Sequence, residues 1–266
     1  MSQSSFTILP ATANDVEALS NISVQSFKDD TNTQLKEKVY GAGWFADCMT
    51  GVIQHYMNRM ENPVPGRTKL TVLKTVDDES GKITGHVTWA EQGLEEASLQ
   101  ATGGLKGEST PDAQEAEKSR DKSREEPQKN NGGGQDSTRK TLAQQKVAEL
   151  EKITSDHMKE WMERIMPEGA KSMFICGISV HPDYQGHGIG KALIQWGTRK
   201  ADERGVVCWV HLSEAGWGVF NKLGWHVEDS LTVDLDQYAA EPPGESSKGS
   251  WGSYTFRYAV RQPCGN

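Results

Sequence analysis

The chain has 266 residues and a formal net charge of −8 at pH 7, from 29 lysines and arginines against 37 aspartates and glutamates. That balance excludes a protein that binds nucleic acid through a generic basic surface, because such a surface needs clustered Lys and Arg. No apolar run reaches the roughly 20 residues that span a bilayer, and the 4 cysteines form no CxxC pair. We therefore expect a cytoplasmic protein with reduced thiols, no metal site, no nucleic-acid partner and no membrane partner.

Hydrophobic periodicity predicts one mixed α/β domain over residues 1–266. Apolar residues alternate in the predicted strands and recur every three or four positions in the predicted helices. Residues 29–44 are expected to form a loop. The predicted elements are, in chain order, strand 6–10, helix 16–27, helix 44–60, strands 69–76 and 83–89, helix 141–166, strand 173–180, helix 188–203, strand 206–212, helix 215–223, and strands 231–235 and 254–260.

Residues 92–139 differ in composition from the rest of the chain. They consist largely of Glu, Lys, Ser, Gln, Gly, Asp and Pro, and no aromatic residue lies between Trp89 and Trp161. Such a segment cannot bury enough apolar surface to offset the entropy of ordering it. We expect a low-complexity, disordered insertion within the single domain, which is either a tolerated surface loop or an arm that binds a partner.

The segment over residues 173–193 carries the chemistry. A predicted strand that ends at Val180 runs into a loop with Gly186, Gly188 and Gly190, and a predicted helix follows. Glycines let the main chain approach a ligand closely, and the first N–H groups of a helix have no partner within the helix. The segment therefore predicts a binding site for a phosphate or pyrophosphate group.

Two familiar phosphate-binding loops do not fit this segment. A P-loop needs glycine at position 185 and Ser or Thr at position 192, where this chain has Gln185 and Ala192. A dinucleotide fingerprint needs glycine at the position of Lys191, and it normally lies in an early βαβ unit. Both alternatives are excluded.

The segment resembles the acetyl-CoA loop of the GCN5-related N-acetyltransferases (GNAT), whose signature Q/R-x-x-G-x-G/A matches Gln185, Gly188 and Gly190. The resemblance covers the chain except for the insertion and the residues after Gln237. It implies a GNAT fold, which is an α/β fold with a central mixed, mostly antiparallel sheet flanked by helices. In this fold the fourth and fifth strands splay apart as a V. Further segments that match the family are His181-Pro182, the helix 188–203, and residues 213–216 and 220–225.

The resemblance also implies an activity, that of an acetyl-CoA-dependent N-acetyltransferase, which is an acyltransferase. Acetyl-CoA would be the co-substrate, and an amine would attack its thioester directly in a ternary complex. Main chain of the strand before the loop would pair with the pantetheine, loop N–H groups would hold the pyrophosphate, and a strand N–H would polarise the thioester carbonyl. The implied acetyl-CoA-binding residues are Ile178, Ser179, Val180, Gln185, Gly186, His187, Gly188, Ile189, Gly190, Lys191, Ser213, Gly216 and Phe220.

Two positions depart from the family pattern. Many relatives place Glu at the position of Cys176, where it deprotonates the amine, and Tyr at the position of Phe220, where it protonates the leaving thiolate. A thiolate can leave as an anion near neutral pH, so the chain can dispense with the tyrosine, but its base must lie elsewhere. The predicted catalytic residues are Glu91 and Ser213, and the other candidate bases are His86, Glu214 and His211.

The acceptor is expected to be the primary amine of a small molecule. The long insertion and the tryptophans resemble those of small-molecule acetyltransferases, and an acidic chain suits cationic amines. Two alternatives stay open: a catalytically inactive acyl-CoA-binding module, and an N-acetyltransferase that acts on proteins or peptides. We expect a monomer or a homodimer. The residues predicted to line the acceptor site are Trp44, His86, Trp89 and Trp217.

Overall fold

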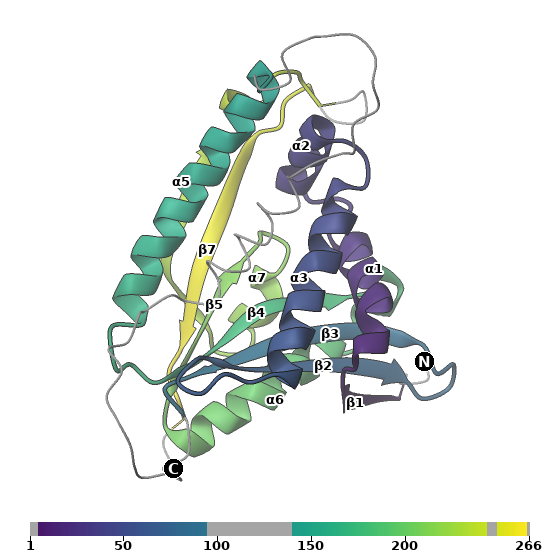
Figure 1. The fold of residues 1–266 in the computed structure, drawn as a ribbon, viewed down its shortest axis with the longest axis vertical. Helices are drawn as coiled ribbons and strands as arrows, with labels where there is room; N and C mark the ends of the chain where they lie inside the picture. Colours follow the sequence, from purple (N-terminus) through teal and green to yellow (C-terminus); the bar gives the residue numbers. More distant parts are fainter. Residues whose placement is uncertain (1–4, 95–139, 244–248, 265–266) are drawn as a thin grey trace.

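The computed structural model of the chain describes residues 5–94, 140–243 and 249–264. Within these ranges the strands form one seven-stranded sheet in the order β1-β2-β3-β4-β5-β7-β6. Every neighbouring pair of strands is antiparallel except β4 and β5, which are parallel. The predicted α/β fold with a mixed, mostly antiparallel sheet is therefore confirmed (Figure 1).

The elements follow the predicted order, with two differences in extent. The strand β6 begins earlier than predicted, and β3 continues to the edge of the first described range. The strands are β1 (Phe6–Pro10), β2 (Lys69–Asp77), β3 (Ile83–Gln92), β4 (Ser172–Val180), β5 (Val207–Leu212), β6 (His226–Asp234) and β7 (Ser253–Arg261). The α-helices are α1 (Val16–Ser26), α2 (Thr31–Tyr40), α3 (Trp44–Glu61), α5 (Leu142–Ile165), α6 (Ile189–Arg204) and α7 (Trp217–Asn221).

Helices cover both faces of the sheet. On one face, α1 and α3 pack over β2, β3 and β4, and α5 lies along β6 and β7 (Figure 1). We call this the α3–α5 face, and its core joins Ile53 of α3 and Trp161 of α5 to Tyr258 of β7. On the other face, which we call the α6 face, α6 packs on β3, β4 and β5. Each strand in the middle of the sheet is thus covered on both sides.

The contact between α6 and β3 is close. The indole Nε1 of Trp89 donates a hydrogen bond to the carbonyl of Leu193 over 3.2 Å. A Cβ atom at Gly197 would lie 2.1 Å from the indole ring, which is far inside van der Waals contact. Only glycine at this position lets α6 approach the sheet so closely.

The helix α2 corrects the prediction of a loop over residues 29–44. The Asp30 carboxylate accepts a hydrogen bond of 2.8 Å from the N–H of Thr33 and so caps the helix. Leu35 is buried in a cluster with Leu150 of α5 and Tyr254 of β7. The sequence of α2 is mostly polar, so its stability comes from this one buried edge and from the cap, which periodicity alone does not reveal.

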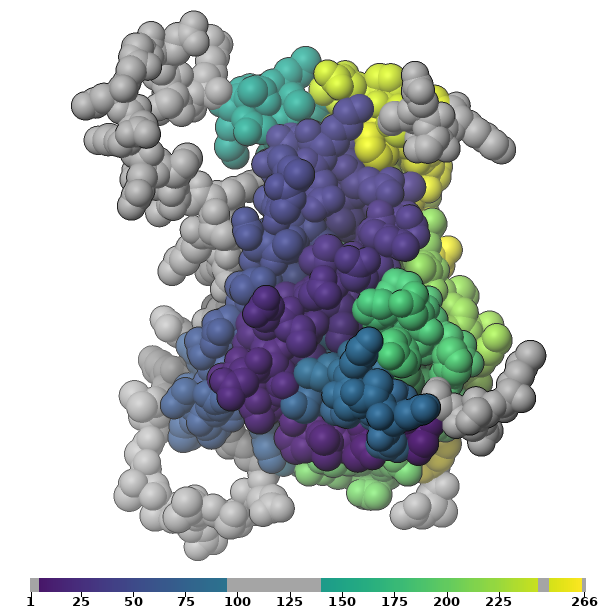
Figure 2. Space-filling view, turned by 90° about the vertical axis from the view of Figure 1, so that its right-hand side faces the viewer, coloured from purple at the N-terminus to yellow at the C-terminus, as the bar shows by residue number. Residues whose placement is uncertain are grey.

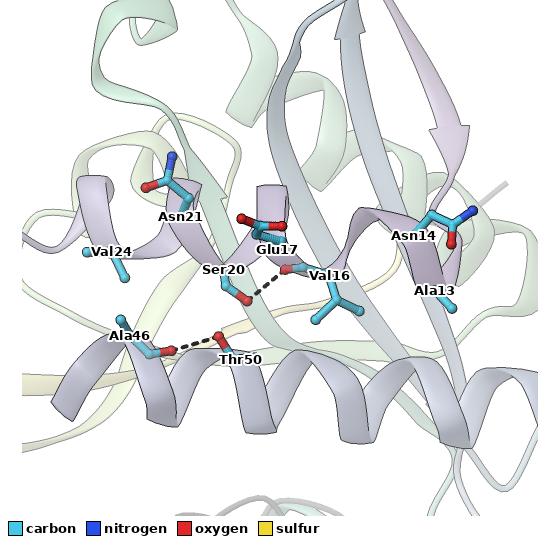
Figure 3. A pocket seen from close by; sticks show the side chains of 9 residues that line it. All are labelled: Ala13, Asn14, Val16, Glu17, Ser20, Asn21, Val24, Ala46 and Thr50. Carbon is cyan, nitrogen blue, oxygen red and sulfur yellow. Dashed lines mark hydrogen bonds between the residues drawn. The ribbon is translucent and has the colours of Figure 1, made fainter. Parts of the chain in front are cut away.

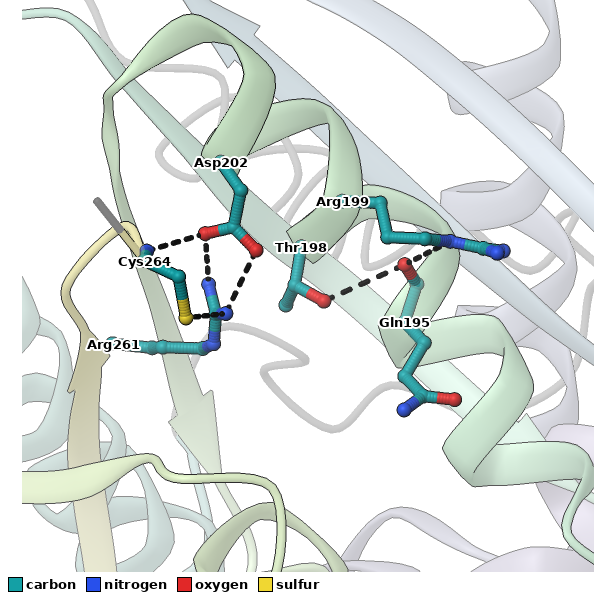
Figure 4. Close-up of polar contacts among 6 residues, drawn as sticks. All are labelled: Gln195, Thr198, Arg199, Asp202, Arg261 and Cys264. Atoms are coloured by element: carbon teal, nitrogen blue, oxygen red, sulfur yellow. Dashed lines mark hydrogen bonds and ion pairs between the residues drawn. The ribbon is translucent and has the colours of Figure 1, made fainter. Parts of the chain in front are cut away.

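The end of β7 is tied to the last turn of α6 (Figure 4). The Arg261 guanidinium donates to both carboxylate oxygens of Asp202, over 2.8 and 2.9 Å, and the N–H of Cys264 donates to the same carboxylate. These hydrogen bonds, that from Arg261 above all, hold the pKa of Asp202 below its ordinary value. The bidentate geometry fixes β7 beside β5.

The predicted insertion over residues 92–139 lies outside the described residues from position 95 onward. Gln92 is the last residue of β3, and the chain is described again from Lys140, just before α5. The insertion therefore stays a prediction. In the described ranges, no helix combines the length and the apolar character that a membrane crossing requires.

Candidate active site

The parallel strands β4 and β5 separate part of the way along their length. They pair from Ser172 with Val207 up to Ile175 with Val210. Beyond this point β4 continues to Val180 and β5 to Leu212 without a further rung between them in the described register. We call the resulting opening the split, and it lies where the predicted V-shaped splay was expected.

A β-bulge in β4 lies at the point of separation. On β3, the adjacent residues Thr88 and Trp89 pair with Gly177 and Ile175, so Cys176 is an extra residue without a rung of its own. A bulge bends its strand and increases the local twist. Because the bulge follows Ile175 directly, β4 turns away from β5 immediately after their last shared rung.

The part of β4 beyond the bulge is laddered to β3 alone. Ile178, Ser179 and Val180 pair with Val87, His86 and Gly85, while the opposite edge faces the split. Main-chain N–H and C=O groups on such an edge can pair with an extended ligand in the way that an added strand does. This edge is therefore a docking line for a linear amide-bearing group such as pantetheine.

The loop after β4 lies at the surface beside the start of α6. Gly186 and Gly188 have φ angles of +79° and +86°, and no atom lies within 4 Å of the place where a Cβ would stand. The first helical hydrogen bond of α6 runs from the N–H of Ala192 to the carbonyl of Gly188. The preceding N–H groups, at residues 189–191, therefore point out of the helix end and suit an anion.

Figure 2 shows this part of the chain, in green, exposed beside α1, in purple. A hydrogen bond links the two segments, because the Ser26 hydroxyl at the end of α1 donates to the carbonyl of Val180 over 2.8 Å. The side-chain amide of Gln185 donates to the same carbonyl over 3.0 Å. The main-chain N–H of Gln185 donates to Pro182, so Gln185 braces the loop and does not offer the pyrophosphate N–H predicted from the resemblance.

Glu91, one of the two predicted catalytic residues, lies away from the split. It pairs with Met173, three positions before the bulge at Cys176 and roughly 10 Å from it along the strand. Its carboxylate, 4% exposed, forms an ion pair with Arg204 at the end of α6. The structure thus places Glu91 at the closed end of the strand pair and on the α6 face, away from the split.

Ser213, the second predicted catalytic residue, directly follows β5 and is half-buried. Its carbonyl accepts a hydrogen bond from the N–H of Gly216 over 3.3 Å, which turns the chain into α7. Ser213 and Gly216 lie at the open end of β5, and their contact with acetyl-CoA stays a prediction. Phe220 is different, because its ring is 1% exposed and packs edge-on against Trp225, so no ligand can reach it.

His86, predicted both as a candidate base and as an acceptor-site residue, is a buried core residue. Its Nε2 lies 2.8 Å from the hydroxyl of Ser23 on α1, and Ser179 is its neighbour on β4. Burial lowers the pKa of His86 from 6.5 to about 4. The imidazole is therefore neutral and enclosed at physiological pH, between α1 and the sheet.

The three predicted acceptor-site tryptophans lie apart. Trp89 is fully buried in the core of the α6 face, and its predicted place in the acceptor site stays a prediction. Trp44 is half-buried at the start of α3, with ring centroids 5.2 Å from Tyr40 and 6.4 Å from Phe45. Trp217 is half-buried at the start of α7 and packs against the α6-face core.

The structure brings a different titratable residue to the split. His211 is the residue of β5 that follows Val210, the last one paired with β4. Its side chain is half-buried, and its ring stacks on Tyr258 of β7. Sequence patterns list His211 among the candidate bases but do not place it, because its position depends on where β4 and β5 stop pairing.

A separate cavity of about 480 Å³ lies between α1 and α3 (Figure 3). Two of its hydroxyl groups are already bonded within their own helices, that of Ser20 to Val16 and that of Thr50 to Ala46. None of the lining residues belongs to β4, β5 or the loop before α6, so this cavity is distinct from the split. The lining residues are Ala13, Asn14, Val16, Glu17, Ser20, Asn21, Val24, Ala46 and Thr50.

The known proteins that match the chain are acetyltransferases. Residues 158–225, which include β4, the loop, α6, β5 and α7, match the model of the acetyltransferase (GNAT) family. The match contains both the split and the glycine loop, and it confirms the predicted family and the predicted enzyme class, an acyltransferase.

Several solved structures resemble the chain at low identity. "Histone acetyltransferase HPA2 and related acetyltransferase" from Corynebacterium glutamicum is 14% identical, with 98% of each chain covered and a TM-score of 0.46. Mosquito "arylalkylamine N-Acetyltransferase like 5b" is 14% identical over 97% of this chain and 100% of its own, with a TM-score of 0.48. Arabidopsis thaliana NAA60, in complex with a bisubstrate analogue, is 12% identical over 98% of this chain and 100% of its own, with a TM-score of 0.45. No curated protein matches the sequence.

Proposed function

We propose that the chain is an acetyl-CoA-dependent N-acetyltransferase that moves the acetyl group to the primary amine of a small molecule. The amine attacks the thioester directly, in a ternary complex with acetyl-CoA. The observation that carries this proposal is the split between β4 and β5, which opens next to the glycine loop within the segment that matches the GNAT family. A docking edge, an anion site and a gap for the reacting groups follow one another along a short stretch of chain.

Each of these parts has one task in the proposed reaction. The N–H groups at the start of α6 hold the pyrophosphate, and the exposed Lys191 adds positive charge beside them. The edge of residues 178–180 that is not paired with β3 binds the pantetheine through main-chain groups other than the Val180 carbonyl, which Ser26 and Gln185 already occupy, and so directs the thioester into the split. A main-chain N–H of this edge polarises the thioester carbonyl as negative charge develops on its oxygen.

The packing of α2 supports a small acceptor. An open groove would suit a peptide, whereas α2 lies against the C-terminal part of the chain. The Tyr254 hydroxyl donates to the Asp30 carboxylate over 2.7 Å, and the Lys38 ammonium donates to the carbonyl of Pro242 over 2.6 Å. Burial, together with the negative charge of Asp30, raises the pKa of Tyr254, so this hydroxyl stays protonated and keeps its donor role.

The four cysteines, which form no CxxC pair in the sequence, suit a reducing compartment. Cys48, Cys176, Cys208 and Cys264 all lie in the described ranges and none of them forms a disulfide. We place the reaction in the cytoplasm on this ground. The proposed partners are acetyl-CoA and a small amine, with the protein as a monomer or a homodimer. Among the described residues, no three His, Cys, Asp or Glu side chains gather as a metal site.

The test is a thiol-release assay with acetyl-CoA and a panel of polyamines, amino acids, aminoglycosides, arylalkylamines and peptides. The blocking variant is Gly188→Trp, which fills the open loop. Gly188 has a φ of +86°, so Gly188→Ala is a matched control that carries the same backbone strain without the bulk. Gly205→Ala is a second control, because Gly205 has a φ of +63° at the opposite end of α6 and also faces open space.

We expect turnover of a small amine that Gly188→Trp abolishes and that both alanine controls retain. Tight binding of CoA without turnover of any amine would favour the inactive acyl-CoA-binding module. Turnover of peptides alone would favour the protein or peptide N-acetyltransferase. Equal loss in Gly188→Trp and Gly205→Ala would trace the effect to α6 stability and would contradict the assigned loop.

A further inference from the structure

We propose that His211 is the general base of this transfer, the group that takes a proton from the acceptor ammonium. The proposal rests on the proposed function and names a residue for a task that the other candidates do not fill. His211 directly follows Val210, which makes the last rung between β4 and β5 with Ile175. Its side chain therefore begins where the two strands start to separate.

The side chain of His211 lies on the α3–α5 face. His211 pairs with Tyr258 across the β5–β7 ladder, so both side chains stand on the same side of the sheet. The two rings are stacked, 4.8 Å apart with an interplanar angle of 17°, and Tyr258 in turn lies 5.2 Å from Trp161 of α5. The helix α6 and its glycine loop belong to the opposite face, so His211 borders the side of the split that is left for the acceptor.

The exposure of His211 differs from that of its two neighbours on β5. Val210 is 1% exposed and Leu212 is 4% exposed, whereas His211 between them is half-buried. Stacking against Tyr258 and Phe256 of β7, with ring centroids at 4.8 and 5.6 Å, restricts the orientation of the imidazole. These ring contacts keep the half-buried imidazole beside the split.

The other candidate bases are occupied or enclosed. The carboxylate of Glu91 is paired with Arg204 on the α6 face, and His86 is buried with its pKa lowered to about 4. The Glu214 carboxylate accepts a hydrogen bond of 3.1 Å from the N–H of Thr255, outside the split. Hydroxyl groups such as that of Ser213 are too weakly basic to take a proton from an ammonium near neutral pH.

The titratable groups gathered around Tyr258, the ring on which His211 stacks, come from four elements. They are Tyr258 itself on β7, Cys176 on β4 and Tyr56 on α3 in the same core cluster, and His157 on α5, which lies 4.0 Å from Asp229 of β6. Of these groups, only the two imidazoles ordinarily change charge between about pH 5 and pH 8. The two histidines lie on either side of the Tyr258 ring, so His157 is the natural comparison for any pH effect.

The proposed step balances in protons and electrons. The neutral imidazole of His211 takes one proton from the acceptor ammonium and becomes imidazolium, which leaves a free amine. The amine lone pair forms the N–C bond to the thioester carbonyl carbon, and the C–S bond then breaks with its electron pair on sulfur. The thiolate takes up the second nitrogen proton through solvent, and the imidazolium returns its proton to solvent. The products are the amide, CoA thiol and one proton.

The test compares pH–rate profiles of the wild type with those of His211→Gln and His211→Asn, from about pH 6 to about pH 10. The probes are acetyl-CoA and tyramine, or the panel amine that the wild type acetylates fastest. His157→Gln and His226→Gln are controls, since His226 is exposed on β6 beside Glu228. CoA binding by calorimetry and thermal unfolding establish that each variant is folded.

We expect kcat/KM of both His211 variants to fall about 100-fold near pH 7, the usual scale of general-base catalysis. The wild-type rate should fall toward acid pH, because an imidazolium cannot accept a proton from the acceptor. In the variants the loss should shrink as pH rises, because solvent then supplies the free amine, and both controls should keep the wild-type profile. A uniform loss at every pH, or an unchanged profile, would overturn the assignment. If no amine is acetylated by the wild type, the proposed function fails with it.

Discussion

The ion pair between Glu91 and Arg204 offers a direct test of the role that the structure gives Glu91. The substitution Arg204→Gln would leave the Glu91 carboxylate, whose side chain is 4% exposed, without its positive partner. Removal of one partner from a fully buried pair costs about 3–5 kcal/mol. Because the Arg204 side chain is 36% exposed, solvent screens part of this interaction, and we expect about 2–3 kcal/mol.

Thermal unfolding measures this loss. For a chain of this size, 1 kcal/mol corresponds to about 2–4 °C, so Arg204→Gln should lower Tm by about 4–12 °C. The double variant Glu91→Gln/Arg204→Gln should regain part of the loss, because it no longer buries an unpaired charge. The exposed pair of Lys152 with Asp156 on α5 is the matched control, and Lys152→Gln should leave Tm unchanged.

The activity of Glu91→Gln decides between a structural and a catalytic role. The variant replaces the carboxylate with a neutral amide of the same shape, so we expect lower stability and a near-normal rate of thiol release below Tm. A base would behave in the opposite way, with a loss of about 100-fold or more in rate. That loss together with an unchanged Tm would refute the placement of Glu91 outside the active site.

Two further predictions test the core on either face of the sheet. Gly197→Ala should destabilise the chain by about 1–3 kcal/mol through overpacking, because its Cβ would lie 2.1 Å from the Trp89 ring. Gly218→Ala is the control and should not destabilise it, because a Cβ at Gly218 meets no atom within 4 Å. Urea unfolding of the two variants measures the difference. Since the pKa of His86 falls from 6.5 to about 4 on folding, the unfolded chain binds a proton in this interval and the folded chain does not. Stability should therefore fall by about 3 kcal/mol as pH drops from about 6.5 to about 4, less so in His86→Gln, and a pH-independent difference between the two proteins would contradict the buried, neutral imidazole.

Local patterns were sufficient for the elements that carry their own signal. The strand β4, the glycine loop and α6 follow from alternation, from glycines at a helix start and from helical periodicity, all within 173–204. The helix α2 was missed because its sequence is mostly polar, with Leu35 as its fully buried apolar contact to the rest of the chain. Its stability depends on residues of α5 and β7 that lie more than 100 positions away, and no local window contains that information.

The same limit applies at the candidate site. Glu91 and Trp89 stand near the end of a predicted strand, where exposed functional residues are common, and the sequence does not reveal that α6 covers them. The partner of Glu91 is Arg204, which is 113 positions further along the chain. Similarly, His211 gains its place only from the register between β4 and β5. The sequence shows which side chains can act as acids, bases or ligands. Which of these side chains come together depends on contacts between residues that are far apart in the chain.

The split is held open because β4 and β5, the strands that border it, are each fixed by other elements. The far end of β4 is laddered to β3, and its last carbonyl, at Val180, accepts hydrogen bonds from Ser26 of α1 and from Gln185. The edge of β5 is laddered to β7, which the Arg261–Asp202 pair ties to α6. The bulge at Cys176 keeps the two strands from pairing further, since continued pairing would need β4 to lose its rungs with β3. The gap is therefore built into the fold, and a ligand that enters it need not first separate two paired strands.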